Sequence, residues 1–227
     1  MEIPFLEPEV IEERAYQLLD DAFGALPDGA VDLKALLFDY LYEEFGLAFY
    51  DDRPLGASSR QDILGITYPI RNEVHVDSAL ASDGHRGRYR FTVAHEIGHW
   101  VLHRPLFLDA DNCQEDSRLV TMQRDVEAAG ESTQDNYSAS EWQANQFAIF
   151  LLLNDPALQR RYDERFQDRP RYFDDEAPPD CGELREFSRH LATAEVDGAT
   201  PLAEHFELSA EATAIALEER GYVEVGK

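Results

Sequence analysis

The spacing of apolar residues predicts two helices near the start of the chain, followed by short strands. Between residues 8 and 25, apolar side chains recur every three or four positions behind Pro8, a residue that suits the first turn of a helix. The same spacing continues from Val31 to Phe45, where Gly46 ends the pattern. Turn residues then separate three strand-like runs, at Leu47 to Tyr50, Ile63 to Ile70 and Val74 to Asp77. We expect these runs to form a small antiparallel sheet.

The middle of the chain is predicted to contain two longer helices. Helical spacing covers about Tyr89 to His103, and Pro105 is expected to stop this helix. It returns from Ser138 to Leu153. The stretch from 109 to 140 between the helices is polar and acidic, with a weakly helical part near Leu119 to Ala128. We therefore expect an excursion of the chain between two helices.

A stretch rich in proline and acidic residues at 168–182 predicts a linker or an extended arm. Three short helical patterns follow it, near Glu183 to Ala192, Pro201 to Phe206 and Ser209 to Arg220. These boundaries predict an α+β domain over 1–167, which is mainly helical and carries the small sheet. A helical subdomain is predicted over 183–227.

The composition indicates a folded, strongly acidic protein. Apolar residues make up 44% of the chain, enough for a core, and 20 basic against 46 acidic residues give a net charge of −26. Such a charge repels nucleic acid and anionic lipid. The longest apolar run, Phe147 to Leu153, is too short to cross a membrane. We expect no signal peptide, and Cys113 and Cys181 are expected to be ordinary thiols of a cytoplasmic protein.

One five-residue motif carries the clearest chemical signal. In His95-Glu96-Ile97-Gly98-His99 the two histidines are four positions apart, so on a helix they share a face and can bind one metal ion. Glu96 lies about 100° around the helix from His95, where it can take a proton from the attacking water. A mid-helix glycine costs roughly 1 kcal/mol, so Gly98 predicts a close contact with a neighbouring element. The alternative is a surface helix with two solvated histidines.

A third metal ligand is expected from the second long helix. The extended zinc motif would place its third histidine at position 105, which is Pro105, so that subclass is excluded. One face of the helix after residue 138 carries residues at i, i+3, i+4 and i+7, namely Glu141, Ala144, Asn145 and Ala148. The small alanines permit a close approach, so Glu141 is predicted to complete the site and Asn145 to hydrogen-bond a liganding imidazole. Alternatively, Glu141 is a solvated residue at the start of the helix.

Other polar residues are candidates for further roles at this site. His103 continues the four-residue spacing but has drifted about 80° from His95 around the helix, so we expect it to support the ligands or to have a structural role. Its use as a ligand is the alternative. A side chain that polarises the substrate carbonyl is sought among the other histidines and two tyrosines, namely His75, His85, His190, His205, Tyr68 and Tyr137.

At these residues the sequence resembles the ImmA/IrrE family of metallopeptidases. The resemblance is carried by Arg90 to His99 with Leu102-His103, and by Glu141-x-x-Ala144-Asn145-x-Phe147-Ala148. Further upstream and downstream segments extend it over most of the chain, and the segment Leu202 to Ser209 is similar to the C-terminal helix-turn-helix-like piece of that family. The stretch between the two motifs is longer than is usual in the family.

The resemblance implies a zincin-like fold, with His95, His99 and Glu141 as zinc ligands and Glu96 as the catalytic glutamate. Zn²⁺ is then the expected cofactor, with Mn²⁺ or another divalent ion as the alternative. Members of the family cleave helix-turn-helix repressors in stress responses or mobile elements. The expected partner is therefore a repressor of this kind or another protein substrate.

The C-terminal helix pair is expected to dock or pack against protein rather than read DNA. A DNA-reading helix carries arginine, lysine, asparagine or glutamine toward the bases. The last helical pattern instead carries Glu211, Glu218 and Glu219 against a single Arg220.

Two functions of different classes follow from these observations. The first is a zinc endopeptidase that hydrolyses one bond of a partner transcription regulator, with the substrate extended along an edge strand near Val74 to Asp77. The second is a zinc-stabilised binding protein that sequesters a repressor or a toxin, in a toxin–antitoxin or phage-related module, without cutting it. An uncoordinated carboxylate at Glu96 favours the enzyme, because a structural metal site has no use for it.

Overall fold

A computed structural model of the protein describes residues 3–58, 61–81, 86–109, 114–122, 139–167, 170–176, 178 and 182–225. By its contacts the chain forms two compact units. The N-terminal unit comprises Met1–Leu26 and Val31–Leu152, and the C-terminal unit comprises Pro27–Ala30 and Leu153–Lys227. The division falls ahead of the stretch 168–182 that we predicted as a linker. Within the described ranges, no helix combines the length and apolar character needed to cross a membrane.

The first two predicted helices form, with one difference in geometry. Helix α1 (Pro8–Phe23) ends where Gly24 adopts a φ of 73°, a left-handed conformation that glycine adopts without strain. The second helical segment is π-helical over η1 (Ala35–Leu41) and continues as α2 (Tyr42–Phe45). It ends at Gly46, as predicted, with a φ of 67°.

The sheet has five strands and is mixed rather than purely antiparallel. Its strand order is β1-β4-β3-β2, and β5 also pairs with β3. The strands are β1 (Ala48–Tyr50), β2 (Ala57–Ser58), β3 (Gln61–Tyr68), β4 (Glu73–Val76) and β5 (Leu119–Met122). The expectation of an antiparallel sheet was wrong for one pair, because β1 joins β4 in parallel instead of pairing with the next strand along the chain.

Two further predictions about this sheet were wrong, one for a segment expected to be helical and one for a strand expected at an edge. Leu119–Met122 is a strand rather than part of a weak helix, which agrees with the β-branched Val120 and Thr121 within it. The rest of that predicted helix, up to Ala128, lies outside the described residues. Strand β4 is paired on both sides, by β1 and by β3, so the segment near Val74 to Asp77 is not an edge along which a substrate could add a strand.

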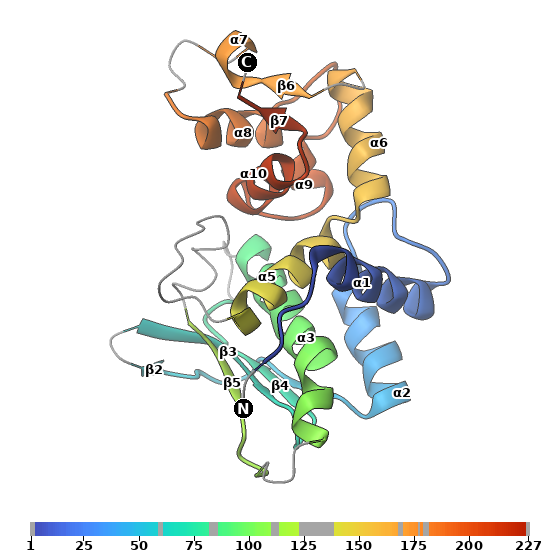
Figure 1. The fold of residues 1–227 in the computed structure, drawn as a ribbon, viewed down its shortest axis with the longest axis vertical. Coiled ribbons are helices and arrows are strands. Elements are labelled where there is room, and N and C mark those ends of the chain that lie inside the picture. The colour runs from blue at the N-terminus through green and yellow to red at the C-terminus, as the bar shows by residue number, and fades with distance from the viewer. Residues whose placement is uncertain are drawn as a thin grey trace. The chain divides into compact units, whose positions relative to one another are not determined.

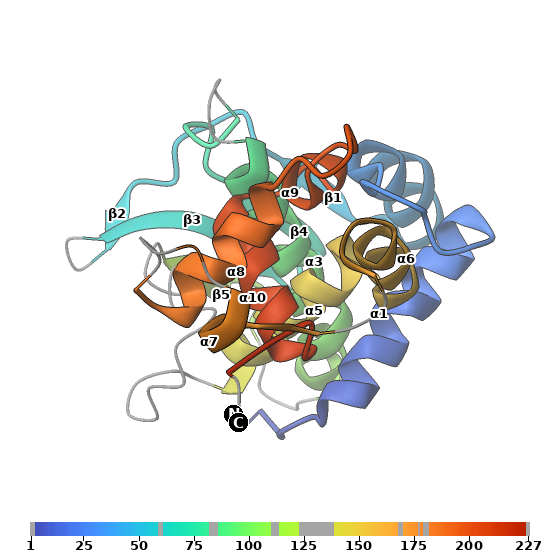
Figure 2. The same ribbon diagram turned by 90° about the horizontal axis from the view of Figure 1, so that it is seen from above.

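The two long helices pack against each other in the N-terminal unit. Helix α3 (Arg86–Leu108) contacts β3, β4 and α5 (Ala139–Leu152), and α1 contacts α5 in turn. Figures 1 and 2 both show α3, in green, alongside α5, in yellow. We had predicted that α3 would stop at Pro105, but the helix continues to Leu108. It resumes after the missing N–H, and the amide of Asp109 donates to the carbonyl of Pro105 at 3.1 Å.

Gly98 marks a close contact between α3 and α5, as its position in the helix predicted. A Cβ added there would lie 3.1 Å from the Cβ of Phe147 and 3.2 Å from the carbonyl oxygen of Ala144. Phe147 and Ala144 are fully buried, so neither has free space to move into. The glycine therefore lets the two helices that carry the candidate metal ligands come together.

Gly98→Ala is expected to destabilise the N-terminal unit by up to about 2 kcal/mol. Overpacking of a close contact typically costs about 1–3 kcal/mol, and alanine recovers part of that through its higher helix propensity, roughly 1 kcal/mol. Urea unfolding of the metal-free protein, followed by tryptophan fluorescence, measures the change, because Trp100 and Trp142 both belong to this unit. An unfolding midpoint at or above that of the wild type would show that the contact is loose.

The C-terminal unit consists of short helices and one small pair of strands. The helices that pack in it are α6 (Asp155–Phe166), α8 (Leu184–Thr193), α9 (Leu202–His205) and α10 (Ala210–Glu219). Strands β6 (Arg171–Tyr172) and β7 (Val223–Glu224) pair in parallel, and α7 (Phe173–Glu176) follows β6. The sequence analysis did not predict α6, which groups with this unit because it contacts α9.

The acidic residues of α10 have a packing role within this unit. Ser209 caps the helix by accepting a hydrogen bond from the amide of Ala212 at 3.0 Å. Arg185 of α8 donates to Glu218 at 2.8 and 2.9 Å and to Glu211 at 2.7 Å. These carboxylates therefore join α8 to α10. That the unit does not read DNA stays a prediction.

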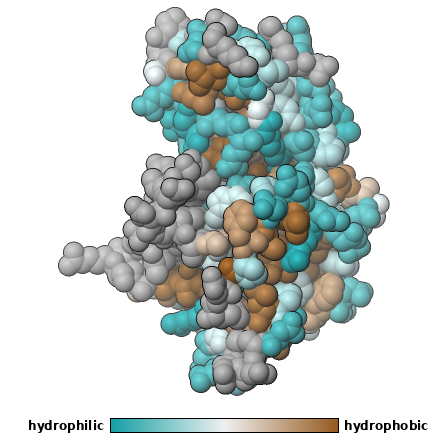
Figure 3. Space-filling view, in the orientation of Figure 1, coloured by the Kyte–Doolittle hydropathy of each residue, from teal (hydrophilic) through white to brown (hydrophobic). Residues whose placement is uncertain are grey.

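Hydrophobic residues also reach the surface. The large exposed ones in the N-terminal unit include three aromatic residues of η1 and α2, namely Phe38, Tyr42 and Phe45. Figure 3 shows brown, hydrophobic patches among the teal, hydrophilic residues on the face that it draws. Hydrophobic patches of this kind are compatible with contacts to another protein.

Candidate metal centre

The two long helices bring three predicted ligands together. The Nε2 atoms of His95 and His99 in α3 lie 3.0 Å apart. Glu141 in the first turn of α5 places its Oε2 atom 3.2 Å from His95 Nε2 and its Oε1 atom 3.3 Å from His99 Nε2. One ligand atom from each residue lies within 4.8 Å of the others. The sequence spacing and the structure therefore select the same three residues.

Neighbouring side chains determine how the two imidazoles face this point. The Nδ1 atom of His95 lies 2.8 Å from Oδ1 of Asn145, one turn after Glu141 on α5. The Nδ1 atom of His99 lies 3.0 Å from Nδ1 of His103. Both Nδ1 atoms thus have partners on the side away from Glu141. Asn145 contacts His95, as predicted, and His103 contacts His99. His103 is not one of the three residues whose ligand atoms converge.

The buried charges of the cluster favour an ionised Glu141. Burial on its own would raise the pKa of Glu141, but His99 and His95 hold it well below its ordinary range. Burial on its own would lower the pKa of His95, yet the hydrogen bond and charge of Glu141 raise it above the ordinary value. The carboxylate thus draws positive charge to this point of the structure.

This donor set fits a divalent metal ion. Two imidazole nitrogens and a carboxylate converge in a buried place, where each offers a lone pair and no apolar group lies between them. Two histidines and one glutamate are the ligand set of a catalytic zinc site that keeps its fourth position open. The helix spacing that brings the nitrogens together is the reason why the sequence motif could predict the cluster.

Glu96 lies beside this cluster and is held by strand β3. It is fully buried, and its Oε2 atom accepts a hydrogen bond from the hydroxyl of Thr67 at 2.6 Å. Its Oε1 atom has no hydrogen-bond partner among the described residues. Burial raises the pKa of Glu96, although charge on His99 and His95 acts in the opposite direction. One carboxylate oxygen is therefore held by Thr67, and the other makes no hydrogen bond to the described residues.

Gly65 of β3 makes room for the Glu96 side chain. A Cβ at this position would lie 2.1 Å from Oε1 and 2.6 Å from Cδ of Glu96. Residues 65 and 67 share a face of the strand, so one stretch of β3 both admits Glu96 and binds it. The sequence analysis missed Gly65 and Thr67. The signal was a glycine inside a strand, which often marks the close approach of another group.

Two of the residues that we considered for polarising a substrate carbonyl, His75 and Tyr68, lie on the face of the sheet opposite to the residues that hold Glu96. His75 stacks on Tyr50 with ring centroids 4.7 Å apart and lies 3.0 Å from Glu73. Tyr68 contacts His75, on the face of the sheet opposite to Gly65 and Thr67. His190 and His205 belong to the C-terminal unit. His85 and Tyr137, like Cys113 and Cys181, lie outside the described residues.

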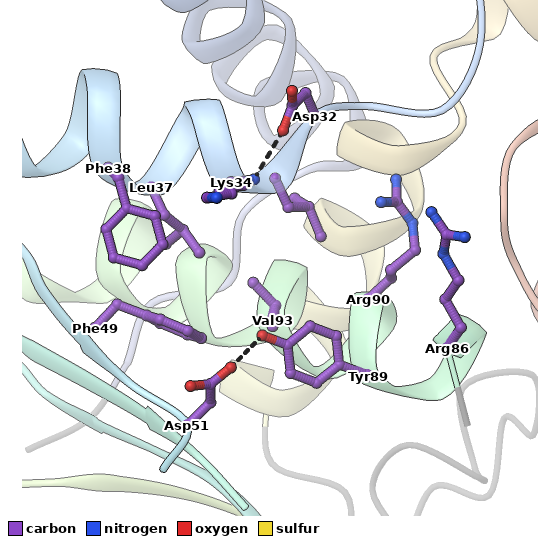
Figure 4. Close-up of a pocket in the computed structure, with 11 residues that line it drawn as sticks. Asp32, Lys34, Leu37, Phe38, Phe49, Asp51, Arg86, Tyr89, Arg90 and Val93 are labelled. Carbon is purple, nitrogen blue, oxygen red and sulfur yellow. Dashed lines mark hydrogen bonds between the residues drawn. The ribbon is translucent and has the colours of Figure 1, made fainter. Parts of the chain in front are cut away.

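A cavity of about 420 Å³ lies beside the start of α3, and its lining includes none of the cluster residues. Figure 4 shows Tyr89 directed toward Asp51, to which its hydroxyl donates a hydrogen bond at 2.7 Å. Phe38 and Phe49 form another part of the lining and contact each other edge to face. The Tyr89–Asp51 bond ties the beginning of α3 to the segment that follows β1.

A helix with the pattern HExxH, completed by a glutamate from a second helix, is the arrangement found in one class of metallopeptidases. The chain belongs to the family of peptidases with the IrrE N-terminal-like domain, whose family model matches residues 65–218. This match confirms the family resemblance found in the sequence and the mainly helical α+β, zincin-like fold. A comparison with curated proteins finds no match.

Proposed function

We propose that the protein is a zinc-dependent endopeptidase that cleaves a helix-turn-helix transcription regulator. The observation that carries this proposal is the convergence of His95, His99 and Glu141 beside a buried carboxylate that is not one of the ligands. A structural metal site needs no such carboxylate. Peptide hydrolysis does, because a proton must leave the attacking water and reach the leaving amine.

The residues of the chain would divide the chemistry as follows. His95, His99 and Glu141 would hold the ion, and Zn²⁺ in such a site supplies Lewis acidity that activates water and polarises a carbonyl. Glu96 would accept the proton of the attacking water on Oε1 and later release it to the leaving nitrogen. Thr67 holds the other oxygen and keeps the carboxylate in one orientation.

Two observations support a transcription regulator as the substrate. The family resemblance implies this substrate class, and the net charge of −26 suits a basic partner such as a DNA-binding protein. The exposed aromatic residues of η1 and α2 supply an apolar surface that such a partner could contact.

Incubation with a candidate regulator tests the proposal. The zinc-loaded protein is mixed with candidate helix-turn-helix proteins, starting with any that is encoded beside its gene, and the products are resolved by mass spectrometry. We expect one discrete cleavage that a chelator abolishes and that added Zn²⁺ restores. A stable complex of the two intact proteins would contradict the proposal and favour sequestration without cleavage.

A further inference from the structure

We infer that Gln143 and His103, anchored by the main-chain carbonyl of Pro4, position His99 for metal binding by fixing which of its ring nitrogens carries the proton. The inference rests on the proposed role of His99 as a metal ligand. It concerns a chain of hydrogen bonds that begins in the N-terminal segment, passes through α5 and ends at the metal centre. Pro4 lies outside residues 65–218, the part that the family model matches.

The chain begins with the amide of Gln143, which is fully buried in α5. Its Nε2 atom donates to the carbonyl oxygen of Pro4 at 2.8 Å. A carbonyl can only accept, so this contact requires the NH₂ group of the amide to face Pro4. The amide oxygen, Oε1, then faces the ring of His103, with its Nε2 atom 3.1 Å away.

The second step fixes the proton of His103. An amide oxygen can only accept a hydrogen bond, so the Nε2 atom of His103 must carry a hydrogen. The ring of His103 is 1% exposed, and its two nitrogens face an amide oxygen and another imidazole, neither of which is an anion. A buried imidazole without an anionic partner stays neutral, so its Nδ1 atom is an acceptor with a free lone pair.

The third step fixes the proton of His99. The Nδ1 atoms of His99 and His103 lie 3.0 Å apart, and one of them must donate to the other. Because His103 accepts at this atom, His99 donates. The Nε2 atom of a neutral His99 is then left with a lone pair. This atom lies 3.0 Å from His95 Nε2 and 3.3 Å from Glu141 Oε1, at the predicted metal position.

The N-terminal segment is held against α5 by a second contact. The ring of Phe5 stacks on Trp142, the residue before Gln143, with centroids 5.3 Å apart and planes at 18°. The stack holds the neighbouring carbonyl of Pro4 where it can accept from Gln143. In the opposite orientation the amide would direct its NH₂ group at His103, favouring the tautomer of His99 that carries its hydrogen toward the ion.

The main test compares two buried glutamines of α5. Gln143→Met keeps the length of the side chain and removes the amide, and Gln146→Met is its matched control on the same helix. Zinc affinity is measured by competition with a chromogenic chelator. We expect Gln143→Met to bind zinc about 10- to 100-fold more weakly, the usual effect of removing a group that orients a metal ligand. The control is expected to stay within about threefold of the wild type, well short of that effect.

Two further variants separate positioning from packing. Gln143→Glu restores an acceptor for His103 Nε2 but offers no donor to Pro4, so it should recover only part of the affinity that Gln143→Met loses. Phe5→Ala should weaken zinc binding in the same direction as Gln143→Met, but less, because the carbonyl of Pro4 and the amide of Gln143 are both still present and only the stack that holds them together is lost. Equal losses in the Met and Glu variants would overturn the inference and indicate a packing effect.

The ring protons can also be observed without any metal or substrate. In ¹⁵N-detected imidazole spectra of the metal-free protein, we expect His99 to carry its hydrogen on Nδ1 and His103 on Nε2. Gln143→Met should change the tautomer populations of both. The inference is wrong if the wild type shows the opposite tautomers or if the variant leaves the populations unchanged. Failure to cleave a regulator would contradict the proposed function and leave these two measurements unaffected.

Discussion

Glu96→Gln is expected to reduce peptide hydrolysis by about 10²- to 10⁴-fold, the range that general acid–base catalysis usually contributes. Glutamine has nearly the same shape as glutamate, and its amide oxygen can still accept the hydrogen bond that Thr67 now donates at 2.6 Å. It cannot take a proton from water near pH 7. The loss should therefore fall on the chemical step rather than on folding.

The same variant should keep its metal. Glu96 is not one of the three residues whose ligand atoms converge, so zinc content and zinc affinity are expected to stay close to those of the wild type. Activity is measured as the rate of fragment formation from the regulator, and zinc by atomic absorption. Glu44→Gln, in an exposed part of α2, serves as the control. A Glu96→Gln protein that cleaves at the wild-type rate would contradict the assignment of the general base.

Gly65→Ala is expected to reduce hydrolysis by at least about 10²-fold, although the substitution adds a single methyl group. The new Cβ would lie 2.1 Å from Oε1 of Glu96, so the carboxylate has to move. The Glu96 side chain is fully buried, and its Oε2 atom accepts a hydrogen bond from Thr67, so the carboxylate has little space in which to shift. Displacement of the base by about 1 Å is enough to cost a factor of this size.

Metal binding separates this effect from unfolding. The three atoms nearest to a Cβ at Gly65 all belong to Glu96, which is not a predicted ligand, so the Gly65→Ala protein should bind zinc with near wild-type affinity while it fails to cleave. Gly182→Ala is a suitable control, because a Cβ at Gly182 meets only Oε2 of Glu186 at 3.7 Å, an ordinary contact. Full activity of the Gly65→Ala variant would mean that Glu96 does not need its present position.

The metal ligands could be predicted from the sequence because their geometry is local. Residues four apart on a helix lie on one face whatever the rest of the fold does, and this fixed His95 with His99. The face shared by Glu141 and Asn145 followed from the same periodicity in α5. Only the contact between the helices was not local, and the small residues at Gly98 and Ala144 indicated it.

The surroundings of Glu96 could not be predicted in this way. Gly65 and Thr67 reach Glu96 only because β3 packs against α3, a contact between segments about 30 residues apart whose register no local spacing reveals. The pairing of β1 with β4 has the same origin. The prediction that α3 stops at Pro105 was wrong because it relied on a local signal alone. A helix held by tertiary contacts can tolerate one missing hydrogen bond.

Gln143 illustrates a third case. Its position in α5 was visible in the sequence, but its partners come from α3 and from the N-terminal segment. Hydrogen bonds that connect three separate segments depend on the complete fold. The sequence therefore supports a prediction of the residues that bind the ion more readily than of those that orient them.

Anomalous diffraction from crystals of the zinc-loaded protein tests the central claim most directly. The account predicts one strong zinc peak at about 2.0–2.2 Å from Nε2 of His95, Nε2 of His99 and a carboxylate oxygen of Glu141, with no protein ligand in the fourth position. A peak elsewhere, a site without Glu141, or a fourth ligand from the chain would contradict it.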